Sequence, residues 1–505
     1  MIRLGLNKYQ EFIELTIEAA REPISKVDTA WLRMEQPTNL MMINGIILMD
    51  EQLDYERLLQ TIEQRFLTFR RFRQKAVERT RGAYWELDED FDIRLHVLRT
   101  ALPGKADQAE LQMLVSELAS TPLNMARPLW QFHVVENYVN GPVLVARIHH
   151  CIADGIALVQ VFLSLTDPTP EGRPSARKPE VWKKRRADEA MVFRRLLDPA
   201  RDGLDLATHL GQQMIAEGSR ILQNPVIASQ YATEASEIVR ELVHSLTLEN
   251  DPETRFKGQL GTRKEVAWAE PLPLDEVKAV SKAFGCTVND VLIAAVTGAI
   301  RQYMISEGDS PEDMEDIRAT VPVNLRPLEH AEELGNHFGL VFLSLPLSAN
   351  SPLERLYAVQ DRMNELKSSK QATVTLGVLA AIGMGPSVLQ KPILDMLSQK
   401  ASAVLTNVPG PQHPLYLAGS KMKEMMFWVP QNGNVGLGIS ILSYNGKVMF
   451  GLIADRRLVA QPSKIISRFK GEFEKLLYLG LMLPLEGQPS PQTAAKLLEN
   501  SPGSD

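Results

Sequence analysis

Apolar residues recur along this chain in two patterns, short continuous runs and helical spacings of three and four residues. A short run predicts a buried strand, and the helical spacing predicts an amphipathic helix. In the N-terminal half the patterns predict strand, helix, strand and helix in turn, at residues 41–48, 55–69, 143–148 and 156–165. In the C-terminal half they predict helices at residues 275–284 and 285–303, and a late hairpin that turns at Asn445 and Gly446.

A chain of 505 residues is too long for one ordinary domain and predicts two. Between residues 167 and 187 the composition changes to prolines, Gly172, Ser175 and basic side chains, which predicts a linker. We therefore expect five segments along the chain: a helical extension (1–26), an N-terminal domain (27–170), a linker with bridging helices (171–254), a C-terminal domain (255–482) and a disordered tail (483–505).

Composition narrows the class of protein. Apolar residues make up 44% of the chain and charged residues 23%, which is typical of a globular protein with an ample core. The net charge of −7 predicts no general attraction to nucleic acid. Two cysteines, Cys151 and Cys286, give neither a disulfide framework nor zinc-ligand spacing, so we expect a reducing, cytoplasmic setting and no metal site.

Membrane contact is predicted to be peripheral. The first residues lack an apolar core segment, so no signal peptide is expected. The longest uncharged stretch, residues 371–390, is interrupted by Gly383, Gly385 and Pro386, which argues against a membrane span. Residues 1–26 favour a docking helix over a membrane helix. A basic cluster could bind anionic lipid or be a solvated linker: Arg173, Arg177, Lys178, Lys183, Lys184, Arg185 and Arg186.

The strongest chemical signal is the segment His149-His150-Cys151-Ile152-Ala153-Asp154-Gly155, placed between a predicted strand and a predicted helix. Adjacent side chains on an extended backbone point to opposite sides, so only one of the two histidines can face a given cavity. A neutral histidine can take a proton from a hydroxyl or a thiol as a general base. Asp154 can brace the turn or orient an imidazole.

Two simpler interpretations compete with catalysis at this segment. One is a histidine pair packed at a strand end, with Asp154 capping the following helix. The other is a metal site, which adjacent histidines without spaced partners do not favour. The seven-residue pattern in its strand–turn–helix setting favours a function.

The start of the helix predicted near residue 288 supports two interpretations. Thr287 and Asp290 are spaced as a helix N-terminal cap. Asn289 lies at the same helix terminus, where amide donors and positive potential could stabilise an oxyanion. The sequence leaves capping and catalysis equally open.

The His-His-x-x-x-Asp-Gly segment resembles the motif of the CoA-dependent acyltransferase superfamily. Further segments resemble the bacterial bifunctional wax ester synthase/diacylglycerol acyltransferases in particular. They are Trp31-Leu32-x-x-Glu35, Pro128-Leu129-Trp130, Asn289-Asp290, Val321-Pro322-Val323-Asn324-x-Arg326, Gly335-Asn336, Asn407-Val408-Pro409-Gly410-Pro411 and Asp455. The family's Met-His-x-Gly is Met42-Ile43-Asn44-Gly45 here, and Asn324 replaces a serine.

This resemblance implies an α/β (α+β) fold of two chloramphenicol-acetyltransferase-like domains, each a mixed sheet with flanking helices, with an active-site tunnel between them. It implies transfer of a fatty acyl group from the co-substrate acyl-CoA to diacylglycerol or a long-chain alcohol, without an acyl-enzyme. His150 would be the base, supported by His149, Asp154 and Gly155, with Asn289 as an oxyanion donor. Candidate contacts of substrate and CoA are Asp290, Asn324, Arg326, Asn407, Pro409 and Gly410. A peripheral association with a membrane or a lipid droplet follows from the insoluble acceptor.

Two other functions stay open. One is a condensation-like acyltransferase that uses carrier-bound acyl groups, and the other is a non-catalytic lipid-binding relative. The chain contains no Gly-x-Ser-x-Gly elbow, which argues against a serine acyl-enzyme.

Overall fold

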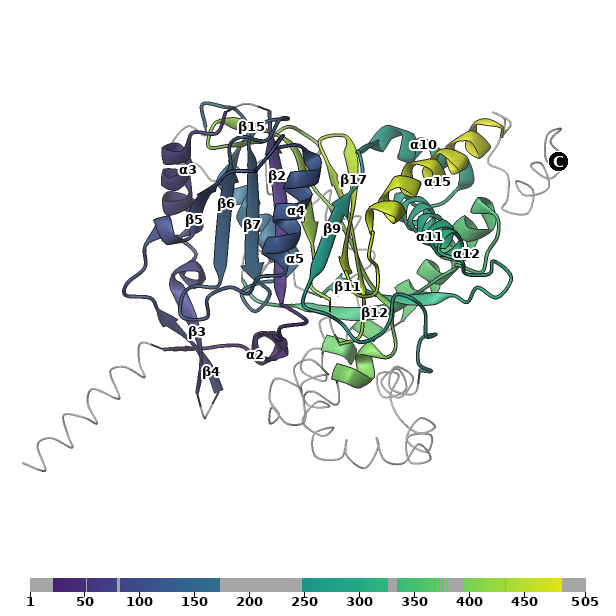
Figure 1. Ribbon diagram of the computed structural model, residues 1–505, viewed down its shortest axis with the longest axis horizontal. Helices are drawn as coiled ribbons and strands as arrows, with labels where there is room; N and C mark the ends of the chain where they lie inside the picture. Colours follow the sequence, from purple (N-terminus) through teal and green to yellow (C-terminus); the bar gives the residue numbers. More distant parts are fainter. Residues whose placement is uncertain are drawn as a thin grey trace, which may run out of the picture.

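The structure, a computed structural model, describes residues 21–50, 52–79, 82–172, 248–325, 334–369, 394–431 and 433–483, together with 371–372, 374–376 and 378. Arg326, the basic cluster, most of the predicted helical extension and bridging helices, and nearly all of the expected tail lie outside these residues. Within them the chain forms two sheet-and-helix halves, the N-terminal one purple to blue and the C-terminal one teal to yellow (Figure 1).

The N-terminal half is built on a seven-stranded sheet with the order β5-β6-β7-β2-β15-β14-β8. Its strands are β2 (Met42–Met49), β5 (Val97–Thr100), β6 (Trp130–Val135), β7 (Val143–His149), β8 (Thr166–Asp167), β14 (Tyr416–Leu417) and β15 (Ser420–Trp428). All seven residues of β7 are buried, which is why this strand reads as a continuous run and shows no alternation.

Helices cover both faces of this sheet. They are α3 (Tyr55–Thr61), continued by a π-helical turn η1 (Ile62–Phe66), α4 (Gln108–Ala119) and α5 (Gly155–Leu165). Arg147 donates to the carbonyl of Thr121, just after α4, whereas Ile148 faces a cavity beneath α5. Neighbouring strand residues point to opposite faces, so α4 and α5 lie on opposite sides of the sheet.

A small subdomain precedes and flanks this sheet. The strands β1 (Glu22–Pro23), β3 (Gln74–Arg79) and β4 (Gly82–Leu87) pair in the order β1-β4-β3. Short 3-10 turns lie at η2 (Arg70–Arg73) and η3 (Ile93–Leu95). Between β1 and β2 lies α2 (Lys26–Met34), capped by the Ser25 side chain, which accepts from the backbone N–H of Asp28.

The C-terminal half has a second seven-stranded sheet, ordered β10-β17-β16-β13-β11-β12 with β9 also paired to β17. Its strands are β9 (Lys264–Trp268), β10 (Leu272–Pro273), β11 (Ile317–Asn324), β12 (Phe338–Leu345), β13 (Ala403–Pro409), β16 (Leu437–Tyr444) and β17 (Lys447–Asp455). Four helices pack beside it in Figure 1: α10 (Leu274–Phe284), α11 (Val288–Ser306), α12 (Pro352–Ser368) and α15 (Ser463–Leu481).

Local signals set the boundaries of these elements. Gly285 adopts a left-handed conformation (φ 65°) that ends α10, so the helix predicted from residue 285 begins only at Val288. Asn445 and Gly446 both have positive φ, 48° and 73°, as the tight hairpin between β16 and β17 requires. In the described parts of the chain, no single helix is long and apolar enough to cross a membrane. The pair α10 and α11 passes that test only together, across a 100° bend.

The two halves interlock and are not simply adjacent. Strand β15 belongs to the C-terminal half in sequence but pairs antiparallel with β2 of the N-terminal half, with Trp428 opposite Asn44 (Figure 1). In return, the hydroxyls of Ser116 on α4 and of Ser120, which directly follows α4, accept from the backbone of β9. The expected boundary near residue 255 therefore divides the sequence but does not divide the sheets.

Candidate functional site

The two-histidine segment closes the end of β7. The backbone N–H of His149 donates to Leu129, and that of His150 donates to Met41. The chain then turns through Cys151 and enters α5 at Gly155. The two histidine side chains consequently leave the strand end in different surroundings.

Asp154 fastens this turn to the C-terminal half. One carboxylate oxygen accepts from the backbone N–H of Ala157 (2.8 Å) and caps α5, and the other accepts from that of His337 (3.0 Å). The backbone N–H of Asp154 also donates to Gly335 (3.3 Å), and Gly335 donates to Ile152 (3.1 Å). The Asp154 side chain thus both caps α5 and braces the turn that carries the two histidines, the two roles considered from the sequence.

Gly335 has to be a glycine for this joint to form. Its φ of +106° is a conformation that side chains rarely adopt. A Cβ at this position would also lie 3.3 Å from a carboxylate oxygen of Asp28. The backbone at Gly335 of the C-terminal half therefore lies close against Asp28 of the N-terminal half.

The His150 imidazole is buried between aromatic rings. Its ring stacks on Trp31 with centroids 4.1 Å apart and 13° between the planes, and Phe338 of β12 lies 5.6 Å away on a tilt. Burial lowers the pKa of His150 to about 4, while the charge of Asp154 acts in the opposite direction. The ring is therefore neutral at neutral pH. Its Nδ1 is buried and has no hydrogen-bond partner among the described residues.

The His149 imidazole has protein groups at both ring nitrogens. Its Nδ1 accepts from the backbone N–H of Cys151 (3.0 Å), so its proton belongs on Nε2. That nitrogen lies 3.3 Å from a carboxylate oxygen of Glu35. The side chain is fully buried. The surroundings thus separate the two histidines: the His149 ring lies between the Cys151 backbone and the Glu35 carboxylate, whereas the His150 ring lies between the rings of Trp31 and Phe338.

Helix α2 and its C-terminal residue supply three contacts to this site that the sequence patterns do not indicate. Asp28 and Trp31 are spaced i, i+3 on one face of the helix, and Glu35, four residues further on, is the residue that ends it. We call these three residues the α2 face. The spacing was visible in the sequence, but nothing in it showed that this face covers the histidines.

Asp28 connects the α2 face to the backbone of His150. Its carboxylate accepts from the backbone N–H (3.0 Å) and the side-chain amide (2.7 Å) of Asn336. The same Asn336 amide donates to the carbonyl of His150 (2.7 Å). Burial raises the pKa of Asp28, with the bonds from Asn336 opposing the shift.

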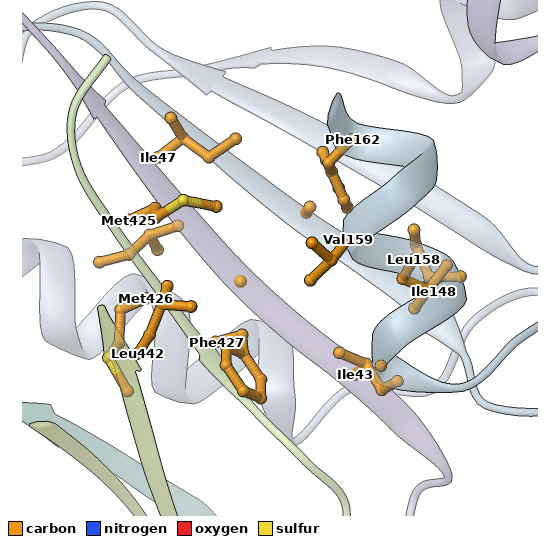
Figure 2. Close-up of a pocket in the computed structure, with 14 residues that line it drawn as sticks. Ile43, Ile47, Ile148, Leu158, Val159, Phe162, Met425, Met426, Phe427 and Leu442 are labelled. Carbon is orange, nitrogen blue, oxygen red and sulfur yellow. The ribbon is translucent and has the colours of Figure 1, made fainter. Parts of the chain in front are cut away.

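An apolar cavity opens beside the motif, between β2, β7, α5 and β15 (Figure 2). It holds about 610 Å³ of space, part of it open to solvent, and every residue that lines it is apolar. Ile148 and Gly155, on either side of the two-histidine turn, are part of its wall. In Figure 2, Val159 and Phe162 of α5 face Met425 and Phe427 of β15 across it.

A second apolar cavity of about 410 Å³ continues the first toward the far end of α5. The two share the residues Ile47, Val159, Phe162, Met425 and Leu442. The second one reaches Gly410, Pro411 and Thr166. Together they follow the length of α5, which at ~1.5 Å per residue is roughly 16 Å.

The structure places the predicted residues of the C-terminal half in a second group. The amide of Asn407 donates to the side-chain oxygen of Asn289 (2.8 Å), and Asn289 is exposed. Asp290 forms a capping box with Thr287 and is buried. Asn324 ends β11, and Pro409 ends β13. No contact between described residues joins Asn289 to His150.

Two other chemistries find little support at the site. The Cys151 thiol is fully buried, and burial raises its pKa well above the usual value, which disfavours the nucleophilic thiolate. Across the described residues, no group of three or more histidine, cysteine, aspartate or glutamate side chains could hold a metal ion.

Comparison with known proteins decides the family. The sequence profile of the wax ester synthase/diacylglycerol acyltransferase catalytic domain matches residues 24–292, and that of the WS/DGAT C-terminal domain matches residues 334–477. The chain belongs to this family. It is an acyltransferase family, so the expectation from the motifs is confirmed at that level. A Mycobacterium tuberculosis relative named "Probable diacyglycerol O-acyltransferase tgs1" is 27% identical over 421 residues, 82% of this chain and 86% of the relative.

Solved structures agree on the fold. The wax ester synthase/diacylglycerol acyltransferase from Marinobacter aquaeolei VT8 matches with a TM-score of 0.63 and 22% identity, over 91% of this chain and 100% of that one. The first condensation domain of the calcium-dependent antibiotic synthetase matches with a TM-score of 0.56 and 13% identity, over 93% and 98%. The expected fold of two acetyltransferase-like halves is confirmed.

Proposed function

We propose that this member of the family transfers a fatty acyl group from acyl-CoA to the hydroxyl of diacylglycerol, of a long-chain alcohol, or of both. The observation that carries the proposal is the wholly apolar cavity whose wall includes Ile148 and Gly155, on either side of His150. An acyl chain requires a dry, apolar site, and the acceptor hydroxyl requires a neutral base near that site to take its proton.

His150 is the proposed base. It takes the proton of the acceptor hydroxyl as the hydroxyl oxygen bonds to the thioester carbon. When the tetrahedral intermediate collapses, the carbon–sulfur bond breaks and the imidazolium returns the proton to the CoA thiolate. The ester and free CoA leave, and no acyl-enzyme forms. The neutral His150 ring and its Nδ1 without a hydrogen-bond partner among the described residues support this assignment, whereas the His149 ring lies between the Cys151 backbone and Glu35.

The other roles follow from contacts. His149, held by Glu35 and the Cys151 backbone, supports the turn. Asp154 fixes the turn against the C-terminal half, and Gly155 leaves space at the cavity wall. Asn289 is proposed to donate to the oxyanion through its amide nitrogen, since its oxygen already accepts from Asn407. Acyl-CoA is the proposed partner of Asp290, Asn324, Arg326, Asn407, Pro409 and Gly410.

An acyl-transfer assay with detection of free CoA tests the proposal. The full chain is incubated with palmitoyl-CoA and, separately, a dispersed diacylglycerol or a long-chain alcohol, with His150→Ala as the control. We expect acceptor-dependent CoA release and a lipid ester product in the parent. Activity only with a carrier-bound acyl group would favour a condensation-like enzyme. Saturable lipid binding without CoA release would favour a non-catalytic relative.

We further propose peripheral association with an anionic membrane or lipid-droplet surface, because the acceptor is insoluble. Basic side chains near such a surface contribute about 1 kcal/mol each, and less at high salt. Flotation with anionic liposomes tests this. Replacing Lys183, Lys184, Arg185 and Arg186 by glutamine should weaken flotation without changing turnover of a detergent-dispersed alcohol. Unchanged flotation would leave the cluster as a solvated linker.

A further inference from the structure

The three residues of the α2 face all contact the two-histidine segment, directly or through Asn336. Trp31 covers the His150 ring, Glu35 contacts the His149 ring, and Asp28 holds the Asn336 amide that binds the His150 carbonyl. Asp28 and Trp31 are buried, and Glu35 is largely so. One helix face therefore contacts both histidines and the backbone that carries the second.

The Trp31–His150 contact restricts the ring that must move a proton. A histidine ring turns about two side-chain bonds, and its broad second torsion is fixed only by its neighbours. Near-parallel stacking at 4.1 Å sets the plane of the ring, and the tilted Phe338 ring limits it from another direction. The Asp28–Asn336 pair meanwhile holds the carbonyl of the same residue. Ring and backbone are thus fixed separately.

We propose that Trp31 is a positioning residue for acyl transfer, whose indole holds the His150 imidazole in one plane while Asp28 and Asn336 hold its backbone. The inference rests on the proposed role of His150 as the base. A misplacement of about 1 Å at such a group can cost about 10²-fold in rate, so the contact has kinetic weight.

The same contact excludes water from the ring. Trp31 and Phe338, the aromatic neighbours of His150, carry no charge. The charged or titratable groups around it are Asp154 at the start of α5, His149 on β7 and, through Asn336, Asp28 on α2. Removing the indole therefore changes the solvation of the ring and leaves these neighbours in place.

The test compares Trp31→Leu, Trp31→Phe and the control Trp85→Leu. Trp85 is also a fully buried tryptophan of the N-terminal half whose indole nitrogen has no described partner, but its ring contacts the Arg71 guanidinium (4.4 Å). Rates are measured across pH with palmitoyl-CoA and a dispersed long-chain alcohol. Separately, ¹³C-labelled histidine signals are titrated, and the His150 signal is assigned by its loss in His150→Gln.

We expect Trp31→Leu to lower kcat roughly 10- to 100-fold, with a change in KM for palmitoyl-CoA of less than about threefold. The midpoint of the His150 titration should rise by about one pH unit or more toward 6.5. The pH at which the rate falls on the acid side of the pH–rate profile should shift upward by the same amount. Trp31→Phe should retain most activity because a stacked ring remains. Trp85→Leu should lower thermal stability and leave both the His150 titration midpoint and the acid side of the pH–rate profile unchanged.

A parental midpoint and kcat in Trp31→Leu would overturn the proposal and make Trp31 an ordinary core residue. Equal losses in Trp31→Phe and Trp31→Leu would also overturn it, because stacking survives in the former. The proposed function fails differently: His150→Gln would then retain parental turnover, while the titration would still show whether Trp31 sets the state of the ring.

Discussion

The indole of Trp31 lies nearly parallel to the imidazole of His150, at 4.1 Å between ring centroids. The contact joins the N-terminal helix α2 to a residue more than a hundred positions later in the chain. It keeps the ring out of water, and burial is the main reason that the pKa of His150 falls to about 4. The proposed base is accordingly held both in position and in its neutral form.

Replacing each histidine separately should rank their roles. His150→Ala is expected to lower the rate of CoA release by about 10²–10⁴-fold, the usual worth of a general base. His149→Ala should cost less, because both His149 nitrogens already face protein groups. Circular dichroism of both variants controls for folding. A larger loss in His149→Ala would assign the base to the other histidine.

Asp154→Asn should lower stability and activity together. An asparagine can still cap α5, but its amide nitrogen cannot accept from the His337 N–H, which loses its partner. The expected cost is about 1–3 kcal/mol in the free energy of unfolding. Asp107→Asn is the matched control, since Asp107 caps α4 and asparagine caps equally well. A variant that melts like the parent but has no activity would instead place Asp154 in the chemistry.

Filling the cavity should change the preferred chain length of the acyl donor. Val159 faces Met425 and Phe427 across the space, so Val159→Phe should reduce the ratio of kcat/KM for palmitoyl-CoA to that for hexanoyl-CoA. Val159→Ala, which enlarges the same site, should not reduce it. The two ratios are measured by CoA release. Equal ratios in both variants would show that the acyl chain binds elsewhere.

Stability should fall as the pH drops from about 6.5 toward 4. Burial lowers the pKa of both His133 and His150 to about 4, so within this window the unfolded chain binds protons that the folded chain does not. Each histidine then removes on the order of 3 kcal/mol by pH 4. The raised pKa of Asp28 acts in the opposite sense, because the folded chain binds that proton more readily.

Urea unfolding at several pH values measures this dependence. His133→Gln should reduce the slope by about 1.4 kcal/mol per pH unit in the middle of the window. His133 contacts Thr100 and Gln131 and lies outside the proposed catalytic residues, so activity at pH 7 should change little. An unchanged slope would mean that His133 titrates normally in the folded protein.

Local chemistry made several features predictable from sequence. The apolar run before His149 became the buried strand β7, and Asp154 with Gly155 became the start of α5. The Asn445-Gly446 pair formed the expected tight turn. Each of these depends on contacts between residues close in sequence, where period, capping and turn preferences decide the backbone. The motifs likewise identify the family from the sequence alone.

What only the tertiary structure decided are contacts between residues far apart in the sequence. The two histidines look alike in the chain, and it is the positions of Glu35, Trp31 and Asn336 that give them different surroundings. Strand β15 could not be assigned to the first sheet, because its pairing with β2 depends on the packing of both halves. Sequence patterns report which face of an element is apolar; which distant face it meets is set by how all the elements fit around one core.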